Sequence, residues 1–96
     1  MGAAIKIYTT EYCGYCVRAK QLFDRKGAEY EEIDVTNRPD LRKWLMTAAN
    51  QRTVPQIFIN GRPQGGFVDI AALERKGELD RLLATEPSPD DPPVKL

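Results

Sequence analysis

The sequence predicts an α/β domain with a four-stranded mixed sheet flanked by helices. Short apolar stretches typical of strands occur near the N-terminus, around Ile33 and around Ile57, and stretches with helical periodicity separate them. Because a helix lies between the first two strands, these strands are expected to be parallel. The Asn60-Gly61 pair is the preferred two-residue hairpin turn, and it makes the last two strands antiparallel.

In the first half of the chain, a strand is expected over residues 3–8 and a helix over residues 15–26. Gly27 stands where a left-handed residue commonly ends a helix. The second strand includes Tyr30 and Ile33, which are out of step with a two-residue alternation. The pattern therefore predicts a bulge or an ambiguous register in that strand.

In the second half of the chain, a helix is expected to start near Asn37, with Pro39 in its first turn. The apolar positions of this helix are Leu41, Trp44, Leu45 and Ala48. Residues 54–59 and 62–65 form the predicted hairpin. Pro63 cannot donate a ladder hydrogen bond, so its strand belongs at the sheet edge. A final helix follows and is expected to break near Gly77.

Composition limits the possible functions. The chain has 96 residues, enough for one domain, and its 14 basic and 14 acidic side chains cancel. We therefore expect no nucleic-acid partner and no membrane partner. Residues 1–8 lack the features of a signal peptide, so we expect the reducing cytoplasm. Residues 1–85 form the predicted domain, and residues 86–96, rich in Pro and Asp, are expected to be disordered.

The sequence Cys13-Gly14-Tyr15-Cys16 carries the chemistry. It stands between an expected strand and an expected helix, so both thiols lie at a helix N-terminus, where unpaired N–H groups stabilise a thiolate on the first of them. Cys13 is the predicted nucleophile and Cys16 the predicted resolving thiol. A zinc site within one chain is excluded because the chain has no His and no third Cys. Two inert buried cysteines fit poorly with the polar, loop-like residues around them.

Three motifs occur in order: Cys13-Gly14-Tyr15-Cys16, residues 52–61 with the sequence RTVPQIFING, and residues 65–69 with the sequence GGFVD. Together they resemble the glutaredoxin family over about residues 4–83, with the dithiol form of its active site. The resemblance implies a thioredoxin-like fold and an enzyme that uses glutathione to reduce glutathione mixed disulfides and protein disulfides.

The resemblance also implies a glutathione site. Thr53, Val54 and Pro55 are similar to the family's cis-proline loop, in which Val54 pairs its backbone with the cysteinyl part of glutathione. The helix start that follows is expected to hold the γ-glutamyl group, and Tyr15 is expected to flank the sulfur. The residues implied at the helix start are Gly66, Phe67, Val68 and Asp69, with Arg42 matched to the glycine carboxylate.

Alternatives remain open for several of these positions. Asp69 could simply cap its helix, and Arg42 could be a solvated charge. Arg18 and Lys20 could raise the positive potential near Cys13, or they could be part of the solvated side of their helix. Gly14 stands where many relatives carry Pro. Similar proteins share a two-iron two-sulfur cluster between subunits, and the resemblance implies Cys13 and glutathione as its ligands here. A cluster-binding carrier is thus the alternative function, and a thioredoxin-like reductase is a third. We expect a monomer, although a cluster-bridged dimer stays possible.

Overall fold

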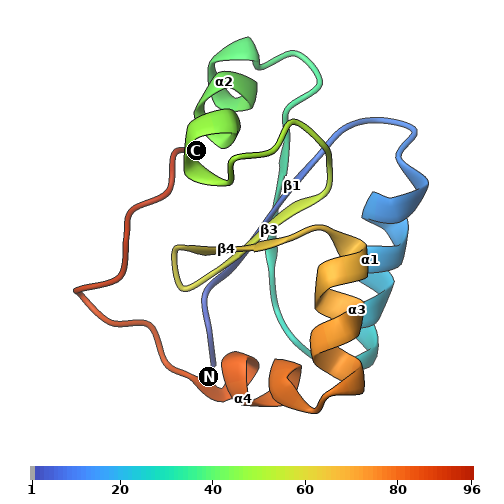
Figure 1. The fold of residues 1–96 in the computed structure, drawn as a ribbon, viewed down its shortest axis with the longest axis vertical. Helices are drawn as coiled ribbons and strands as arrows, with labels where there is room; N and C mark the ends of the chain where they lie inside the picture. Colours follow the sequence, from blue (N-terminus) through green and yellow to red (C-terminus); the bar gives the residue numbers. More distant parts are fainter. Residues whose placement is uncertain (1) are drawn as a thin grey trace.

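The computed structural model describes residues 2–96. Within them lie eight helices and strands, in the order β1 (Ile5–Thr9), α1 (Gly14–Arg25), β2 (Glu31–Asp34), α2 (Pro39–Ala48), β3 (Gln56–Ile59), β4 (Arg62–Gly65), α3 (Phe67–Arg75) and α4 (Glu78–Ala84). The sheet order is β2-β1-β3-β4. β1 pairs in parallel with β2 and antiparallel with β3, and β4 forms the antiparallel edge (Figure 1). The predicted mixed four-stranded sheet is confirmed.

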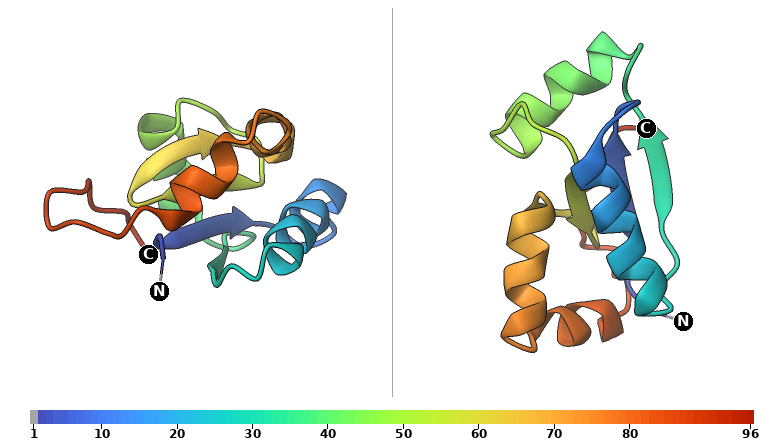
Figure 2. Two further views of the ribbon diagram at one scale, coloured as in Figure 1. Left: turned by 90° about the horizontal axis from the view of Figure 1, so that it is seen from below. Right: turned by 90° about the vertical axis from the view of Figure 1, so that its right-hand side faces the viewer.

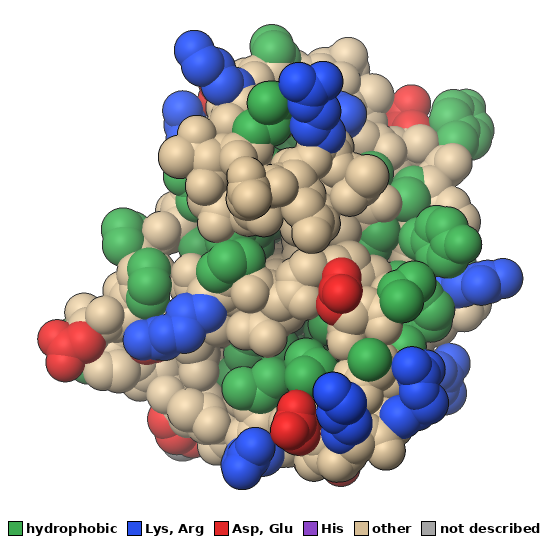
Figure 3. Space-filling view, in the orientation of Figure 1, with side chains coloured by type: hydrophobic (Ala, Val, Ile, Leu, Met, Phe, Trp, Pro, Cys, Tyr) green, Lys and Arg blue, Asp and Glu red, His purple; other side chains and the backbone are tan. Residues whose placement is uncertain are grey.

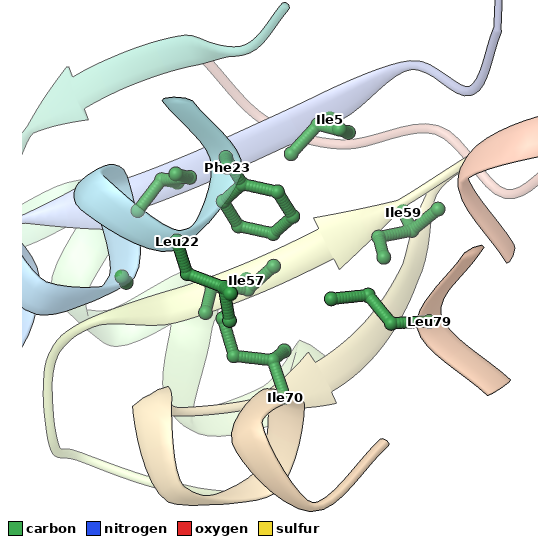
Figure 4. Packing of buried hydrophobic residues seen from close by; sticks show 9 residues of the cluster. Ile5, Leu22, Phe23, Ile57, Ile59, Ile70 and Leu79 are labelled. Carbon is green, nitrogen blue, oxygen red and sulfur yellow. The ribbon is translucent and has the colours of Figure 1, made fainter. Parts of the chain in front are cut away.

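Helices cover both faces of the sheet. α1 and α3 lie side by side on one face with α4 beneath them, whereas α2 lies on the other face (Figure 2). The first face is closed by aliphatic side chains and Phe23, several of which Figure 4 labels. Their buried side chains converge from β1, β3 and three helices, so α1 is packed firmly against the sheet.

The second core is smaller and aromatic. Tyr8, Trp44 and Phe58 pack with their ring centroids 5.3 to 5.6 Å apart. This arrangement explains the alternation along β3, because Ile57 and Phe58 belong to different cores. It also explains the mismatch in the second strand. Tyr30 packs against the first core and Ile33 against the second, and β2 pairs with β1 in unbroken register, so the predicted bulge is absent from β2.

Local signals place the element ends. Gly27 is left-handed after α1, Gly77 is left-handed between α3 and α4, and Asn60 and Gly61 both have positive φ in the hairpin turn, as their sequence predicts. Arg38 is the N-cap residue of α2, directly after Asn37, and Pro39 is in the first turn, as predicted. A register shift does occur in the sheet, but it lies between Ile57 and Phe58 where β3 pairs with the edge strand.

The C-terminal tail differs from the expectation of disorder. Residues 86–96 form no helix or strand, yet they run along the molecule from α4 to α2 (Figure 1). Val94 packs against the second core, and the buried hydroxyl of Tyr8 donates a 2.7 Å hydrogen bond to the carbonyl of Lys95. Asp91 pairs with Arg62 at 2.6 Å. A single short helix covers this face, and the tail buries apolar surface that α2 does not reach.

Candidate functional site

Cys13 occupies the N-cap position of α1. Its backbone is extended, with φ −107° and ψ 106°, and its sulfur accepts the N–H of Cys16 at 3.2 Å. This is the place where a helix offers unpaired N–H groups and the positive end of its dipole. The Cys13 thiol also donates to the carbonyl oxygen of Val54 at 3.8 Å. The sulfur is therefore held between the helix start and the loop before β3.

Cys16 is in a different environment, although it lies only one helical turn further on. Its side chain is 2% exposed, whereas Cys13 is partly exposed. Burial raises the pKa of Cys16 well above its ordinary value, and the hydrogen bond with the sulfur of Cys13 raises it further. A backbone hydrogen bond at Thr10 and the charge of Lys20 act in the opposite direction. Cys16 therefore stays a neutral thiol at neutral pH.

The loop before β3 reaches the cysteines. The peptide bond between Val54 and Pro55 is cis. Thr53 is exposed, and Val54 is half-buried against the second core. Because the carbonyl of Val54 faces the sulfur of Cys13, the backbone of this loop forms one wall beside the thiol.

The start of α3 lies against the same loop. A Cβ atom added to Gly66 would be 3.2 Å from the carbonyl oxygen of Pro55, and one added to Gly65 would collide with the carboxylate of Asp69. Glycine thus lets the two segments approach. Asp69 Oδ2 accepts the N–H of Gly66 at 2.9 Å, so this residue does cap its helix. Its other oxygen, Oδ1, makes no hydrogen bond with any of residues 2–96.

Aromatic and apolar side chains lie at the starts of α1 and α3. The ring of Tyr15 stacks on that of Phe67 with centroids 6.3 Å apart, and the guanidinium of Arg18 lies 5.6 Å from the Tyr15 ring. This contact joins the first turns of α1 and α3. Large apolar side chains exposed near these turns are Tyr12, Tyr15, Val17 and Val68. Figure 3 shows such side chains gathered over the starts of both helices.

One expected residue, Arg42, lies on a fourth element, α2. Arg42 is exposed on α2, and its side chain makes no hydrogen bond or ion pair with any of residues 2–96. The other expected residues lie on three neighbouring segments: the first turn of α1, the loop before β3 and the start of α3.

A groove that was not predicted from the sequence lies on the β2 side of the cysteines. It has a volume of about 460 Å³, and both cysteines line it together with Thr9, Lys20 and Glu32. Lys20 pairs with Glu32 at 3.0 Å, and the buried hydroxyl of Thr9 donates to the same carboxylate at 2.8 Å. The three residues come from α1, β2 and β1, so no local pattern could have linked them.

Among residues 2–96, no group of three or more His, Cys, Asp or Glu side chains is placed to hold a metal ion. A cluster shared between two subunits stays a prediction, because one chain was expected to supply only Cys13. None of the helices described for residues 2–96 is both long enough and apolar enough to cross a membrane.

Comparison with known proteins gives a consistent result. The family model that matches residues 5–63 is described as Glutaredoxin. A Pseudomonas aeruginosa glutaredoxin is 50% identical over 80 residues, covering 83% of this chain and 95% of that protein. The solution structure of a Brucella melitensis glutaredoxin has a TM-score of 0.79 and 46% identity, covering 88% of this chain and 91% of that one. The crystal structure of a buckwheat glutaredoxin–glutathione complex has a TM-score of 0.79 and 36% identity, covering 84% of this chain and 76% of that one.

Proposed function

Because the chain belongs to the glutaredoxin family of thiol–disulfide oxidoreductases, we propose that it reduces glutathione mixed disulfides and protein disulfides with glutathione as co-substrate. The meeting of three segments around one sulfur carries this proposal. Cys13 Sγ lies 3.8 Å from the carbonyl oxygen of Val54, and Gly66 approaches the carbonyl of Pro55. An extended ligand joined to Cys13 would therefore meet the loop before β3 and the start of α3.

With a glutathione mixed disulfide, the Cys13 thiolate attacks the glutathionyl sulfur. A disulfide between Cys13 and glutathione forms, and the substrate leaves as a thiolate that takes up a proton. The thiolate of a second glutathione then attacks the glutathionyl sulfur held on Cys13. Oxidised glutathione leaves, and the Cys13 thiolate is regenerated. A reducing compartment such as the cytoplasm keeps both cysteines in the thiol form that starts this cycle.

With a protein disulfide, Cys13 forms a mixed disulfide with one substrate sulfur and releases the other as a thiolate. Cys16 then loses its proton and attacks Cys13, which frees the substrate and leaves a disulfide between Cys13 and Cys16. Two glutathione molecules reduce this disulfide and depart as one oxidised glutathione. The raised pKa of Cys16 keeps it from competing with Cys13 for the substrate in the first step, and Cys16 must lose its proton before it attacks in the second.

The proposed glutathione contacts follow the three segments. The backbone of Val54 pairs with the cysteinyl part of glutathione, and Thr53 and Pro55 hold that backbone in place. The γ-glutamyl carboxylate meets N–H groups of Phe67 and Val68 at the start of α3. The free oxygen of Asp69 accepts the α-ammonium group, and Gly66 allows the close approach.

Two further side chains complete the proposed site. Tyr15 lies over the start of α3 through its contact with Phe67, so its ring flanks a molecule bound between α1 and α3. Arg42 is free to reach the glycine carboxylate from α2, a role that suits a guanidinium group. The glutathione bound to the buckwheat relative supports the choice of co-substrate. The protein partners are glutathionylated or disulfide-containing proteins, and the enzyme acts as a monomer.

The substitution Asp69→Asn tests this site. Asparagine can still accept the N–H of Gly66, so helix capping is kept. Loss of the negative charge facing a bound ammonium should weaken transition-state binding by about 1 to 3 kcal/mol, close to tenfold or more in kcat/KM. The measurement compares a glutathionylated peptide with the same peptide carrying a β-mercaptoethanol mixed disulfide.

Only the glutathionylated peptide carries the γ-glutamyl residue and its α-ammonium group, so the loss should be confined to that substrate. The result that rejects the site is full efficiency of Asp69→Asn with the glutathionylated peptide, or an equal loss with both peptides. An equal loss would mean that Asp69 serves only to cap α3.

A further inference from the structure

We infer that Gln56 is a positioning residue for the glutathione reaction, because its buried amide holds the loop that lies beside Cys13. This inference rests on the proposed function. Gln56 is the first residue of β3 and is fully buried. It is a polar residue within an otherwise apolar strand, and its side chain turns back toward residues 51–53.

The amide nitrogen of Gln56 makes three contacts with this loop. It donates to the carbonyl of Thr53 at 2.8 Å and to Gln51 Oε1 at 3.0 Å, and the hydroxyl of Thr53 lies at 3.3 Å. Residues 50–55 belong to no helix or strand. Within residues 2–96, the side-chain hydrogen bonds that this loop makes end on the amide of Gln56 or on the thiol of Cys13. The amide is therefore the loop's main polar anchor.

The same amide is poorly suited to stabilising the protein. Its oxygen, Gln56 Oε1, is buried and has no hydrogen-bond partner among residues 2–96. A buried acceptor without a partner costs free energy, which an apolar side chain of similar size would not. Thr53 and Gln51 are exposed residues, so the Gln56 amide does not pair with another fully buried residue. Stability alone therefore favours an apolar residue at this position.

The anchor acts directly on the geometry at the sulfur. The carbonyl of Thr53 is held by Gln56, and the carbonyl of the next residue, Val54, accepts from Cys13 Sγ. A loop that drifts would move the backbone of Val54 away from a glutathionyl group on Cys13. Misplacement on the order of 1 Å can cost up to about a hundredfold in rate. Reactions that do not use the Val54 backbone should be less affected.

The test uses Gln56→Met, which keeps the size of the side chain and removes its donors. Gln21→Met is the matched control, since Gln21 is exposed on α1 and distant in sequence from the loop. Single-turnover rates are measured with a glutathionylated peptide and with the same peptide carrying a β-mercaptoethanol mixed disulfide. We expect Gln56→Met to lower the first rate roughly tenfold and the second less than about twofold. Its Tm should equal or exceed that of the wild type.

A milder variant covers the case in which Gln56→Met does not fold. Gln51→Met removes a single contact from an exposed side chain, so it should fold and should lower the rate with the glutathionylated peptide by roughly two- to threefold. The inference is overturned if both variants keep the wild-type ratio of the rate with the glutathionylated peptide to the rate with the β-mercaptoethanol peptide. A fall in Tm with equal loss of both rates overturns it too. If the wild type itself shows no preference for the glutathionylated peptide, the proposed function fails as well.

Discussion

The two cysteines of this site differ in exposure and in hydrogen bonding, although they are separated by only two residues. Cys13 is partly exposed and accepts an N–H at the helix start, whereas Cys16 is buried and keeps its proton through a raised pKa. Position in the first turn of α1 produces this difference: the N-cap faces outward, and the residue three positions later faces the core. A single helix end thus assigns two roles to one residue type.

The largest expected effect is loss of all activity in Cys13→Ser. A serine hydroxyl is not ionised at neutral pH and cannot form the mixed disulfide, and the buried Cys16 cannot replace it. Turnover of both glutathionylated peptides and protein disulfides should fall to the rate given by glutathione alone. Activity above that rate would mean that the roles of the two cysteines are wrongly assigned.

The substitution Cys16→Ser should separate the two substrate classes. Reduction of glutathione mixed disulfides needs only Cys13 and should be kept, whereas reduction of a protein disulfide stalls at the mixed disulfide with the substrate. Both reactions are followed with glutathione and glutathione reductase, and mass spectrometry detects the trapped intermediate. An equal loss in both assays would contradict the independent action of Cys13.

The pH dependence of alkylation compares the thiols directly. Iodoacetamide reacts with thiolates, so the remaining Cys16 of Cys13→Ser should react slowly at neutral pH and faster only as the pH rises toward its raised pKa. Burial is the main cause of that shift and persists in the variant. Cys13, measured in Cys16→Ser, should react faster than Cys16 at neutral pH. The reverse order would show that burial does not protect Cys16.

Features set by neighbouring residues could be predicted from the sequence. The ends of α1 and α3 follow from Gly27 and Gly77, and the hairpin follows from Asn60 and Gly61, because each needs a positive φ that its residue type supplies. The position of Cys13 at a helix start follows from a strand, a loop and a helix in succession. These signals were sufficient for the order of strands and helices and for the place of Cys13, whereas the other segments beside the thiol were implied by the resemblance to the family.

Features that join distant segments could not be predicted in this way. The amide of Gln56 interrupts an apolar strand, which is a visible signal, but its partners depend on how the preceding loop folds back. The tail was expected to be disordered from its composition, yet Val94 and the Tyr8 hydrogen bond depend on a sheet face that α2 leaves open. The groove beside the cysteines likewise needs β2 placed next to α1.

The smallest expected effect concerns Lys20, whose charge lowers the pKa of Cys16 while burial raises it. Lys20→Met removes this charge and leaves Glu32 unpaired beside the groove. Both changes disfavour the Cys16 thiolate. The resolving step should therefore slow by roughly two- to fivefold, which corresponds to the loss of about 0.5 to 1 kcal/mol from a partly exposed charge interaction. Reduction of glutathionylated peptides, which does not use Cys16, should be unchanged.

The resolving rate is measured in single turnovers with a protein disulfide across neutral and mildly alkaline pH. The slowing should shrink as the pH rises, because Cys16 then ionises without help from Lys20. Lys43→Met on α2 is the control for loss of a surface charge. In a double variant with Glu32→Gln, part of the lost rate should return, since the opposing charge is also gone. If Lys20→Met resolves as fast as Lys43→Met at neutral pH, Lys20 is only a solvated charge, and burial alone distinguishes Cys16 from Cys13.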